Sequence, residues 1–343
     1  MKKLLLLIVV SCILYYHGNA QSTCTQTLRT ARATYDQGRL QELPALLEGC
    51  LRNGFSTQEK VEAYKLLTLA YIYLEEPDKA DGAMLAILNT DHYFEVNSST
   101  DPAEFIALYK TFRTKPIYRI GGKIGAIATM PNVVEAVKAN NGDSKYTAKI
   151  GVQLHFAFEI PLSEKLTFNP EIGFMQRNFG YENTTNFIDT TFSTVATEKQ
   201  NWISLPINVQ YQFEMQNFKP FIALGFQTDY LLGSNFTGSR TRKGYQFIEE
   251  KSFNLGTQRE KFNMSVVAGA GAHFKLGGGL VTAEVRILYG LKNVNSKTTA
   301  FAVDSNLPFQ YGYADSIYKL NSISATVGYV HNIFNPKKLH KRK

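Results

Sequence analysis

Long apolar runs are missing from most of this sequence. After residue 20, no segment is apolar over the 18 or more residues that a membrane-crossing helix needs. Beyond that point the chain has no candidate membrane helix. It could enter a bilayer only through strands that close into a barrel, because such strands pair their backbone hydrogen-bonding groups with one another.

Cysteine is also scarce, with three in 343 residues. Cys12 lies in an N-terminal segment typical of a signal peptide, in which Lys2 and Lys3 precede the apolar run Leu4–Val10 and Gly18-Asn19-Ala20 forms a small-residue cleavage site. We expect residues 1–20 to be removed. The alternative is lipidation at Cys12, which we disfavour because the apolar core before it would be very short.

Cleavage after Ala20 leaves Cys24 and Cys50 as the cysteines of the mature chain. Exported proteins fold in an oxidising compartment, so we predict a disulfide between these two residues. It would close a loop of about 26 residues and would stabilise the fold by roughly 3–4 kcal/mol through loop entropy.

Basic residues outnumber acidic ones, and the formal net charge is +8. Two of these charges belong to Lys2 and Lys3 and five to the basic tail, residues 335–343, so the body of the chain is nearly neutral. A nucleic-acid-binding protein carries its positive charge as a patch on the folded surface, so this distribution argues against a nucleic-acid partner. A short basic tail is usually solvated; the alternative is that it contacts an acidic partner or lipid head groups.

Histidines are few and do not lie where catalysis would need them. The sequence has six, and none lies in the four long polar segments 130–145, 178–200, 233–260 and 292–317. A Ser/His/Asp-type site there would require one, so we predict no enzyme activity. His155 and His273 lack a third ligand at metal-binding spacing, and Gly277-Gly278-Gly279 lacks the Lys-Ser/Thr of a phosphate loop. We therefore expect no cofactor and no metal.

Helical spacing of apolar residues dominates the first third of the chain. It predicts five helices, over about 24–36, 40–52, 57–75, 77–90 and 102–113. Ser56 stands three residues before Glu59, which is the spacing of a capping box, and Asp101-Pro102 is a typical helix start. We assign residues 21–116 to a small all-α domain.

Within this domain, residues at regular positions in the segment 61–90 resemble a tetratricopeptide repeat. These residues are Tyr64, Leu67, Tyr71, Ala80, Met84 and Ile87. The resemblance implies stacked helix pairs whose groove binds a partner protein, and it makes Tyr64, Tyr71 and Tyr73 candidate partner-binding residues. The alternative is a compact helical domain with no partner.

From Tyr118 to about Val330, apolar and polar residues alternate instead, most clearly in Trp202–Leu232. The alternation predicts eight strands, over about 118–129, 146–160, 166–177, 201–215, 218–232, 261–275, 280–291 and 318–332. Each strand is long enough to cross a membrane when tilted, which takes roughly 9–11 residues. We expect the apolar faces to meet lipid; the alternative is a soluble β-sandwich. Pro170 and Pro206 lie within strands, where we expect bulges.

Short and long connections alternate between the predicted strands. Residues 161–165, 216–217 and 276–279 form short turns, and the four long polar segments form the other connections. This alternation is typical of outer-membrane barrels, whose short turns face the periplasm. We therefore predict a mainly β protein: an eight-stranded antiparallel transmembrane β-barrel over 117–334, preceded by the all-α domain. An even number of strands would place the helical domain and the basic tail in the periplasm.

Five stretches of the strand region carry a family resemblance: Trp202–Phe213, Lys219–Gly225, Phe262–Leu276, Glu284–Val294 and Ile323–Val330. They resemble the PorT-like outer-membrane β-barrel family. The resemblance implies a barrel of the outer membrane, and the family name derives from a component linked to secretion. The helical domain is additional to the basic barrel of that family.

The inward faces of the predicted strands carry charges of both signs. The candidate interior network is Lys123, Lys149, His155, Glu159, Glu171, Arg177, Asp229, Glu284 and Arg286. An eight-stranded barrel is just wide enough for its side chains to fill, so we expect these residues to pair with one another as a plug. The alternative is a narrow solute path.

Together these features predict a non-enzymatic outer-membrane barrel that anchors a periplasmic protein-interaction domain within a secretion or envelope assembly. The alternative is a small porin or solute channel. The expected partners are outer-membrane lipid and a periplasmic protein, and no small-molecule substrate is identified.

Overall fold

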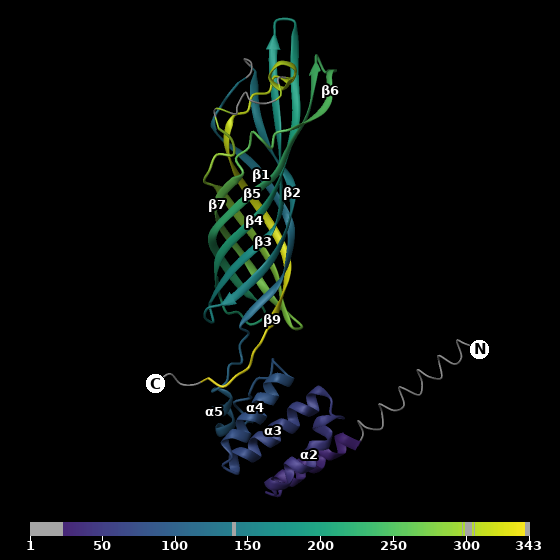
Figure 1. Ribbon diagram of the computed structural model, residues 1–343, viewed down its shortest axis with the longest axis vertical. Coiled ribbons are helices and arrows are strands. Elements are labelled where there is room, and N and C mark those ends of the chain that lie inside the picture. Colours follow the sequence, from purple (N-terminus) through teal and green to yellow (C-terminus); the bar gives the residue numbers. More distant parts are fainter. Residues whose placement is uncertain (1–22, 139–141, 297, 299–303, 305, 340–343) are drawn as a thin grey trace, which may run out of the picture. The chain divides into compact units, whose positions relative to one another are not determined.

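The computed structural model describes residues 23–138, 142–296, 298, 304 and 306–339, so the predicted signal peptide and Cys12 lie outside the described residues. The chain divides into two compact units, and the helices of the first carry the purple and blue of the early sequence in Figure 1. The helical unit combines the chain up to Pro116 with the segment that starts at Phe334. The barrel unit runs from Ile117 to Ile333.

All five predicted helices are present in the helical unit. The first covers residues 23–36, and the later elements are η1 (Leu40–Glu42), α2 (Leu43–Arg52), α3 (Thr57–Tyr73), α4 (Pro77–Thr90) and α5 (Ala103–Tyr109). The capping box starts α3, because Ser56 Oγ accepts from the Glu59 backbone N–H and the Glu59 carboxylate accepts from the Ser56 backbone N–H.

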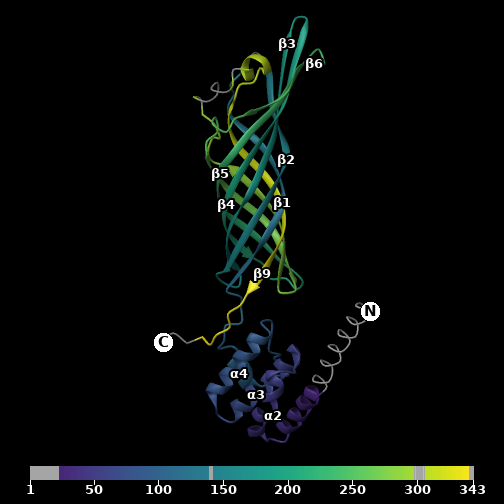
Figure 2. The same ribbon diagram turned by 45° about the vertical axis from the view of Figure 1, so that its right-hand side comes forward.

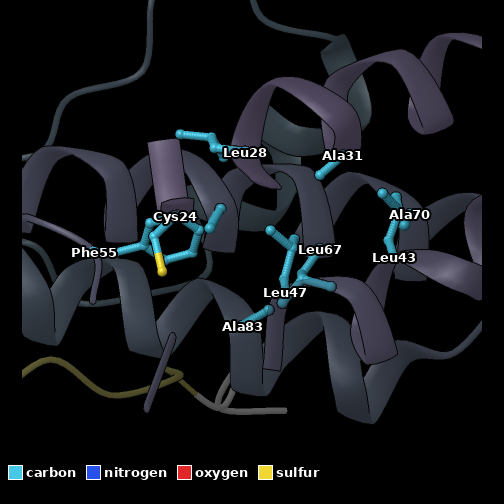
Figure 3. Close-up of a cluster of buried hydrophobic side chains, with 10 residues drawn as sticks. Cys24, Leu28, Ala31, Leu43, Leu47, Phe55, Leu67, Ala70 and Ala83 are labelled. Atoms are coloured by element: carbon cyan, nitrogen blue, oxygen red, sulfur yellow. The ribbon is translucent and has the colours of Figure 1, made fainter. Parts of the chain in front are cut away.

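An apolar core joins the first helix to α2 and α3. Leu28, Leu43, Leu47 and Leu67 are buried in it, and Figure 3 shows their side chains converging from different helices. The predicted disulfide between Cys24 and Cys50 is confirmed, with the two Cα atoms 5.6 Å apart. It links the first helix covalently to α2.

Residues 334–339 also pack on the helical unit. Lys338 forms an antiparallel β-bridge with Phe112, and backbone hydrogen bonds flank the bridge on both sides. The Lys338 ammonium pairs with Asp81, and the Phe334 ring stacks on His92 with ring centres 5.1 Å apart. The helices therefore hold this part of the tail.

Eight strands of the barrel unit form a closed antiparallel ring (Figure 1 and Figure 2). In ring order they are β1 (Tyr118–Glu135), β2 (Asp143–Pro161), β3 (Leu166–Phe187), β4 (Thr190–Gln212), β5 (Lys219–Arg242), β7 (Phe262–Leu276), β8 (Gly279–Gly290) and β9 (Ile317–Ile333). A further strand, β6 (Tyr245–Asn254), pairs with the end of β5 beyond the ring. Paired residues followed from Lys123 through β2, β3, β4 and β5 lead to Asn263 on β7. Paired residues followed the other way, through β9 and β8, lead to His273 on the same strand. The strands of the closed ring are therefore staggered by ten residues.

The two ends of the ring differ. The β2–β3, β4–β5 and β7–β8 connections are brief and define the short-turn end; the other is the long-loop end. There β3, β4 and β5 extend to 22, 23 and 24 residues, and Figure 2 shows them projecting beyond the ring. The prediction of loops over 178–200 and 233–260 is therefore wrong for much of their length. Threonine-rich segments pair there, because β-branched residues suit a pleated sheet.

The bulges predicted at the two prolines are also absent. Pro170 pairs with Ile207 and Pro206 pairs with Gln227, and the register on either side is unchanged. Between β3 and β4 the pairing instead lapses after Pro170 and resumes at Gly173 and Ser204. A local gap in the ladder thus accommodates the missing N–H donor without adding a residue.

Apolar side chains face outward over the middle of the ring. Ile150, Leu154 and Ile207 are 73%, 57% and 52% exposed, whereas the inward positions of the same strands are buried and largely polar. This inversion matches a barrel that is surrounded by lipid. Among the described residues, no helix has the length and apolar character to cross a bilayer.

Candidate functional site

Four charged side chains fill the middle of the lumen, and we call them the central ion cluster. Lys123 from β1, Glu171 from β3, and Glu284 with Arg286 from β8 are each at most 4% exposed. Glu171 accepts from Lys123 Nζ at 2.7 Å and from two Arg286 nitrogens at 2.8 and 2.5 Å. Glu284 accepts from Lys123 at 3.3 Å and from Arg286 at 2.8 Å. Two cations and two anions therefore neutralise one another inside the barrel.

Glycines on neighbouring strands make room for the central ion cluster. A Cβ on Gly328 would lie 2.6 Å from Lys123 Cγ, and a Cβ on Gly269 would lie 3.1 Å from Arg286 Cγ. Any larger residue at Gly328 would displace the lysine. Strand alternation puts Glu284 and Arg286 on the same face of β8, which explains why both reach the cluster.

A second ion pair lies between the central ion cluster and the long-loop end. Arg177 and Asp229 are fully buried and are joined by a 2.9 Å hydrogen bond. Gln227 Nε2 donates to the other Asp229 oxygen at 2.7 Å. The Arg177 guanidinium also lies 5.7 Å from the ring centre of Trp202, within reach of a cation–π interaction. These contacts form a separate polar layer across the lumen.

The two inward histidines lie apart from each other. One nitrogen of His155 is 2.8 Å from Ser204 Oγ, and one nitrogen of His273 is 2.8 Å from Thr282 Oγ1. His273 also stacks on Phe221, with ring centres 4.5 Å apart. No group of three or more potential metal ligands gathers in the described part of the chain.

Of the remaining two residues of the predicted network, one lies inside the barrel and the other lies on its outer face. Glu159 is buried near the short-turn end and accepts a 3.1 Å hydrogen bond from Arg119. Lys149 is exposed and does not join the interior network. A register shift between Lys149 and Gln153 in the β2–β3 pairing turns Lys149 to the outer face, where its Nζ bonds to Thr197 Oγ1.

Another charged set, the loop-end ion cluster, was not identified from the sequence. Arg259 pairs with Glu198 at 2.7 Å and with Asp315, and the side chains of all three are buried. The Tyr313 hydroxyl donates to Asp315 at 2.8 Å, and the Tyr318 hydroxyl lies 3.4 Å from Glu198. All three charged residues fall in segments predicted to be long polar loops, so no strand periodicity indicated that they share one lumen.

The pKa values of the two loop residues in this cluster both rise, for different reasons. Burial raises the pKa of the Asp315 carboxyl above its usual value, even with Arg259 beside it. Burial alone would lower the pKa of Arg259, but the carboxylates of Asp315 and Glu198 hold it well above its usual value. Arg259 therefore stays charged, and Asp315 protonates more readily than an exposed aspartate.

Aromatic side chains cover the loop-end ion cluster. The π-helical turn η2 (Leu307–Tyr311) buries both of its end residues. The Tyr313 ring packs on Tyr181 and Phe236, with ring centres 4.8 and 4.3 Å away. The described part of the β8–β9 connection thus folds into the mouth of the ring, and the lumen is filled at this end as well as at its centre.

The helical unit carries a groove of about 480 Å³, which we call the helical groove. Its apolar lining comes from the end of α3, the start of α4 and from α5: Tyr71, Ile72, Pro77, Ala80, Ala107 and Leu108. Four carboxylates also line it: Glu75, Glu76, Asp81 and Glu104. Lys338 pairs with Asp81 and Lys79 pairs with Glu76, so two of the four carboxylates already have an ammonium partner.

The three candidate partner-binding tyrosines do not gather. Tyr71 lines the helical groove, with Lys79 Nζ 5.6 Å from its ring centre. Tyr64 packs against the apolar core and is partly buried. Tyr73 is 53% exposed and does not line the groove. Helical spacing alone could not separate the core tyrosine from the groove tyrosine.

Solved structures with a similar fold include several bacterial barrels. Neisserial surface protein A (NspA) is 10% identical, with 62% of this chain and 97% of that chain covered and a TM-score of 0.31. OprG from Pseudomonas aeruginosa is 11% identical, with 64% and 97% covered and a TM-score of 0.34. Ail from Yersinia pestis is 10% identical, with 63% and 99% covered and a TM-score of 0.29. With TM-scores between 0.29 and 0.34, these likenesses carry no argument about this chain.

No curated protein matches the chain. A family described as outer membrane protein beta-barrel domain matches residues 116–296, which is more than half of the sequence. The matched region covers most of the ring, whose apolar side chains face outward. The chain therefore belongs to the outer membrane protein β-barrel domain family and is a protein of the outer membrane.

Proposed function

We propose that this protein is a non-enzymatic anchor, in which the barrel holds a tetratricopeptide-like helical domain in the periplasm as the docking point of a secretion or envelope assembly. The observation that carries the proposal is the helical groove, an apolar channel lined by carboxylates on a unit that is tethered to a membrane barrel. The partner is a protein segment that offers both apolar and basic side chains.

The chain path supports a periplasmic helical domain. Tyr118 and Ile333 pair with each other, so the ring begins and ends at the short-turn end. Short turns of outer-membrane barrels face the periplasm. Both stretches of the helical unit therefore leave the ring on the periplasmic side.

The composition of the helical groove supports a basic partner. Glu75 and Glu104 line it beside the Asp81–Lys338 and Glu76–Lys79 pairs, so the four carboxylates outnumber the two ammonium groups that pair with them. Apolar surface from Leu108 and its neighbours would give the affinity, and the carboxylates would select a segment with lysine or arginine.

The filled lumen supports anchoring over solute conduction. The central ion cluster, the Arg177–Asp229 pair and the loop-end ion cluster each place buried, paired charges across the ring. A conducting path would require each of these layers to open. Separating a buried ion pair costs several kcal/mol per ion when no water replaces the partner.

Site-specific cross-linking in living cells tests the proposal. A photoreactive residue at Ala107, inside the helical groove, should trap a periplasmic protein, whereas the same residue at Tyr73 should not. Reversing two groove charges, with Glu75→Lys and Glu104→Lys, should lower the yield of the Ala107 adduct roughly tenfold by repelling the basic partner.

The matched control reverses two exposed carboxylates elsewhere on the helical unit, with Glu42→Lys and Glu48→Lys, and should leave the adduct yield unchanged. The absence of any adduct from Ala107 would refute the proposal. Equal loss of adduct in both charge-reversed variants would show that the helical groove does not select basic partners.

A further inference from the structure

The outer face of the barrel changes from apolar to polar along a line that crosses β3 and β4, whereas on β5 the apolar face extends to Leu232. Phe174, Ile203 and Tyr230 are register neighbours on this face and are 39–43% exposed. The next outward pair toward the long-loop end is Gln176 and Asn201, which share a 3.2 Å hydrogen bond. In a barrel surrounded by lipid, such a change marks where acyl chains give way to head groups.

Lys199 lies on the head-group side of this line. It is exposed on the outer face of β4, two residues beyond Asn201. Its register neighbours are Asn178 on β3 and Asn235 on β5. The ammonium group is therefore surrounded by amides at the height where lipid phosphates lie.

Lys149 reaches the same place from β2. Its register partner is Asn178 on β3, yet its Nζ donates to Thr197 Oγ1 on β4, so the side chain crosses β3. Gly180 lies under this crossing, because a Cβ there would come within 3.2 Å of Lys149 Cε and 2.3 Å of Thr147 Oγ1. A side chain at position 180 would therefore crowd the lysine.

The two lysines bring positive charge together without a counter-charge. Thr197 and Lys199 are two residues apart on one face of a strand, which is about 7 Å. In the part of the chain that the structure describes, neither Lys149 nor Lys199 pairs with a carboxylate, and Glu182 on the same face is taken by Lys145 at 2.9 Å. Neighbouring like charges repel each other, and an anion between them would add an attraction to each that offsets this repulsion.

We infer that Lys149 and Lys199 form a binding site for the phosphate of a lipid head group in the leaflet at the long-loop end. The two ammonium groups supply charge-assisted hydrogen bonds to the phosphate oxygens, and Asn178, whose amide donates to the Ile150 carbonyl at 2.8 Å, is a neutral neighbour of both lysines. The acyl chains of the same molecule would lie along the apolar face below, at Phe174 and Ile203. The adjoining apolar band favours a lipid over a free phosphate ion, because the lipid gains both charge pairing and chain contact.

Lipid binding to the full-length protein in detergent tests this inference, with native mass spectrometry counting the bound molecules. Dioleoyl phosphatidic acid and dioleoylglycerol have the same chains and differ in the phosphate, so the first should bind and the second should bind far more weakly. Each lysine near an anionic membrane surface contributes a similar binding free energy, and the contributions of two lysines together correspond to roughly a 30-fold change in affinity. The Lys149→Gln/Lys199→Gln variant should lose about this factor.

Two variants sharpen the test. Lys243→Gln/Lys251→Gln removes two lysines of the β5–β6 hairpin and should keep native affinity. Gly180→Ala keeps both lysines but crowds the Lys149 stem and should weaken binding by a smaller factor, about fivefold. The mobility shift between heated and unheated samples on a denaturing gel shows that each variant has folded.

Unchanged phosphatidic acid binding in the Lys149/Lys199 variant would overturn the site, and so would equal binding of dioleoylglycerol. Full displacement by millimolar inorganic phosphate would assign the lysines to a soluble anion and overturn the lipid assignment.

Discussion

The helical unit and the barrel bury opposite kinds of side chain. The helical core consists of residues such as Leu43, Leu47 and Met84, each with no exposed surface. The barrel interior instead holds charges such as Lys123 and Arg286, while leucines and isoleucines cover its outside. In both units the apolar side chains avoid water. Water surrounds the first unit, so they lie inside it, and lipid surrounds the second, so they lie on its outer face.

The contrast determines what stabilises each unit. Around the helical core, apolar burial is favourable because it removes carbon surface from water. Inside the barrel, polar groups have to find partners within the ring because lipid offers none. Ion pairs that contribute little on a protein surface are therefore required in the lumen, where an unpaired charge is costly.

The largest expected effect comes from breaking the central ion cluster. Arg286→Ala would leave Glu171 and Glu284 with Lys123 as their one remaining cationic partner in that cluster. We expect the free energy of unfolding of the barrel to fall by about 3–5 kcal/mol, because an uncompensated carboxylate would remain buried. Urea titration of the protein refolded into lipid vesicles measures this change.

The matched control removes an arginine from the surface of the helical unit. Arg39 pairs with Glu42 in an exposed i,i+3 pair, and Arg39→Ala should cost less than about 1 kcal/mol. A barrel that tolerated Arg286→Ala equally well would show that water in the lumen screens these charges, and the contrast between the two units would then fail for ion pairs.

The same leucine substitution should have different costs in the two units. Leu47→Ala in the helical core should lower the free energy of unfolding by about 3–5 kcal/mol, from lost apolar transfer plus the cavity that remains. Leu154→Ala on the outer face should cost about 1–2 kcal/mol. Fluid lipid chains fill the space, so the loss is limited to the free energy of transferring the removed carbon atoms from water to an apolar medium. Urea titrations of both variants, with far-ultraviolet circular dichroism for the helices and gel mobility for the barrel, give the comparison.

Equal losses at Leu47 and Leu154 would contradict this account. They would indicate that the outer face of the barrel packs against protein rather than lipid. A third variant, Leu205→Ala on the outer face of β4, provides a second lipid-facing position for the same measurement.

Sequence periodicity predicted the parts of the fold where one side of an element meets a different medium. Alternation located all eight strands of the ring, because apolar and polar positions repeat every two residues where lipid lies on one side. It failed beyond the membrane, where both faces of β3 and β4 carry polar residues, such as Asn183 on the inner face and Glu182 on the outer face of β3, and no alternation of apolar and polar residues remains to mark a strand. The loop-end ion cluster was missed for the same reason.

Alternation also fails where the register shifts. Lys149 shares the parity of His155 and was therefore assigned to the lumen, but the irregular pairing between Lys149 and Gln153 reverses the face. A one-residue irregularity moves every later side chain to the opposite face of the sheet, and no feature of the local sequence indicates it. The Cys24–Cys50 pairing was predictable because two cysteines allow one connectivity.

The smallest expected effect is a difference in pH dependence between two aspartates, one in each unit. Burial alone would raise the pKa of Asp101 in the helical unit, but Lys65 and the Asn97 backbone N–H bring it below its usual value. Asp101 therefore contributes to stability at pH values above its unfolded-state pKa, and this contribution is lost as the pH falls through its folded-state pKa. Burial raises the pKa of Asp315 at the long-loop end, so its contribution is present below the unfolded-state pKa and is lost as the pH rises through the folded-state value.

Hydrogen exchange of the full chain across the acidic range, corrected for intrinsic rates, measures this difference. Protection near Asp101 should fall toward acid, and Asp101→Asn should flatten that trend. Protection around Asp315 should fall in the opposite direction, and Asp315→Asn should flatten it without affecting the helical unit. If both regions lost protection toward acid, the pKa of Asp315 would be lowered like that of Asp101, and its ion pair with Arg259 would outweigh the cost of burial in the same way that Lys65 does for Asp101.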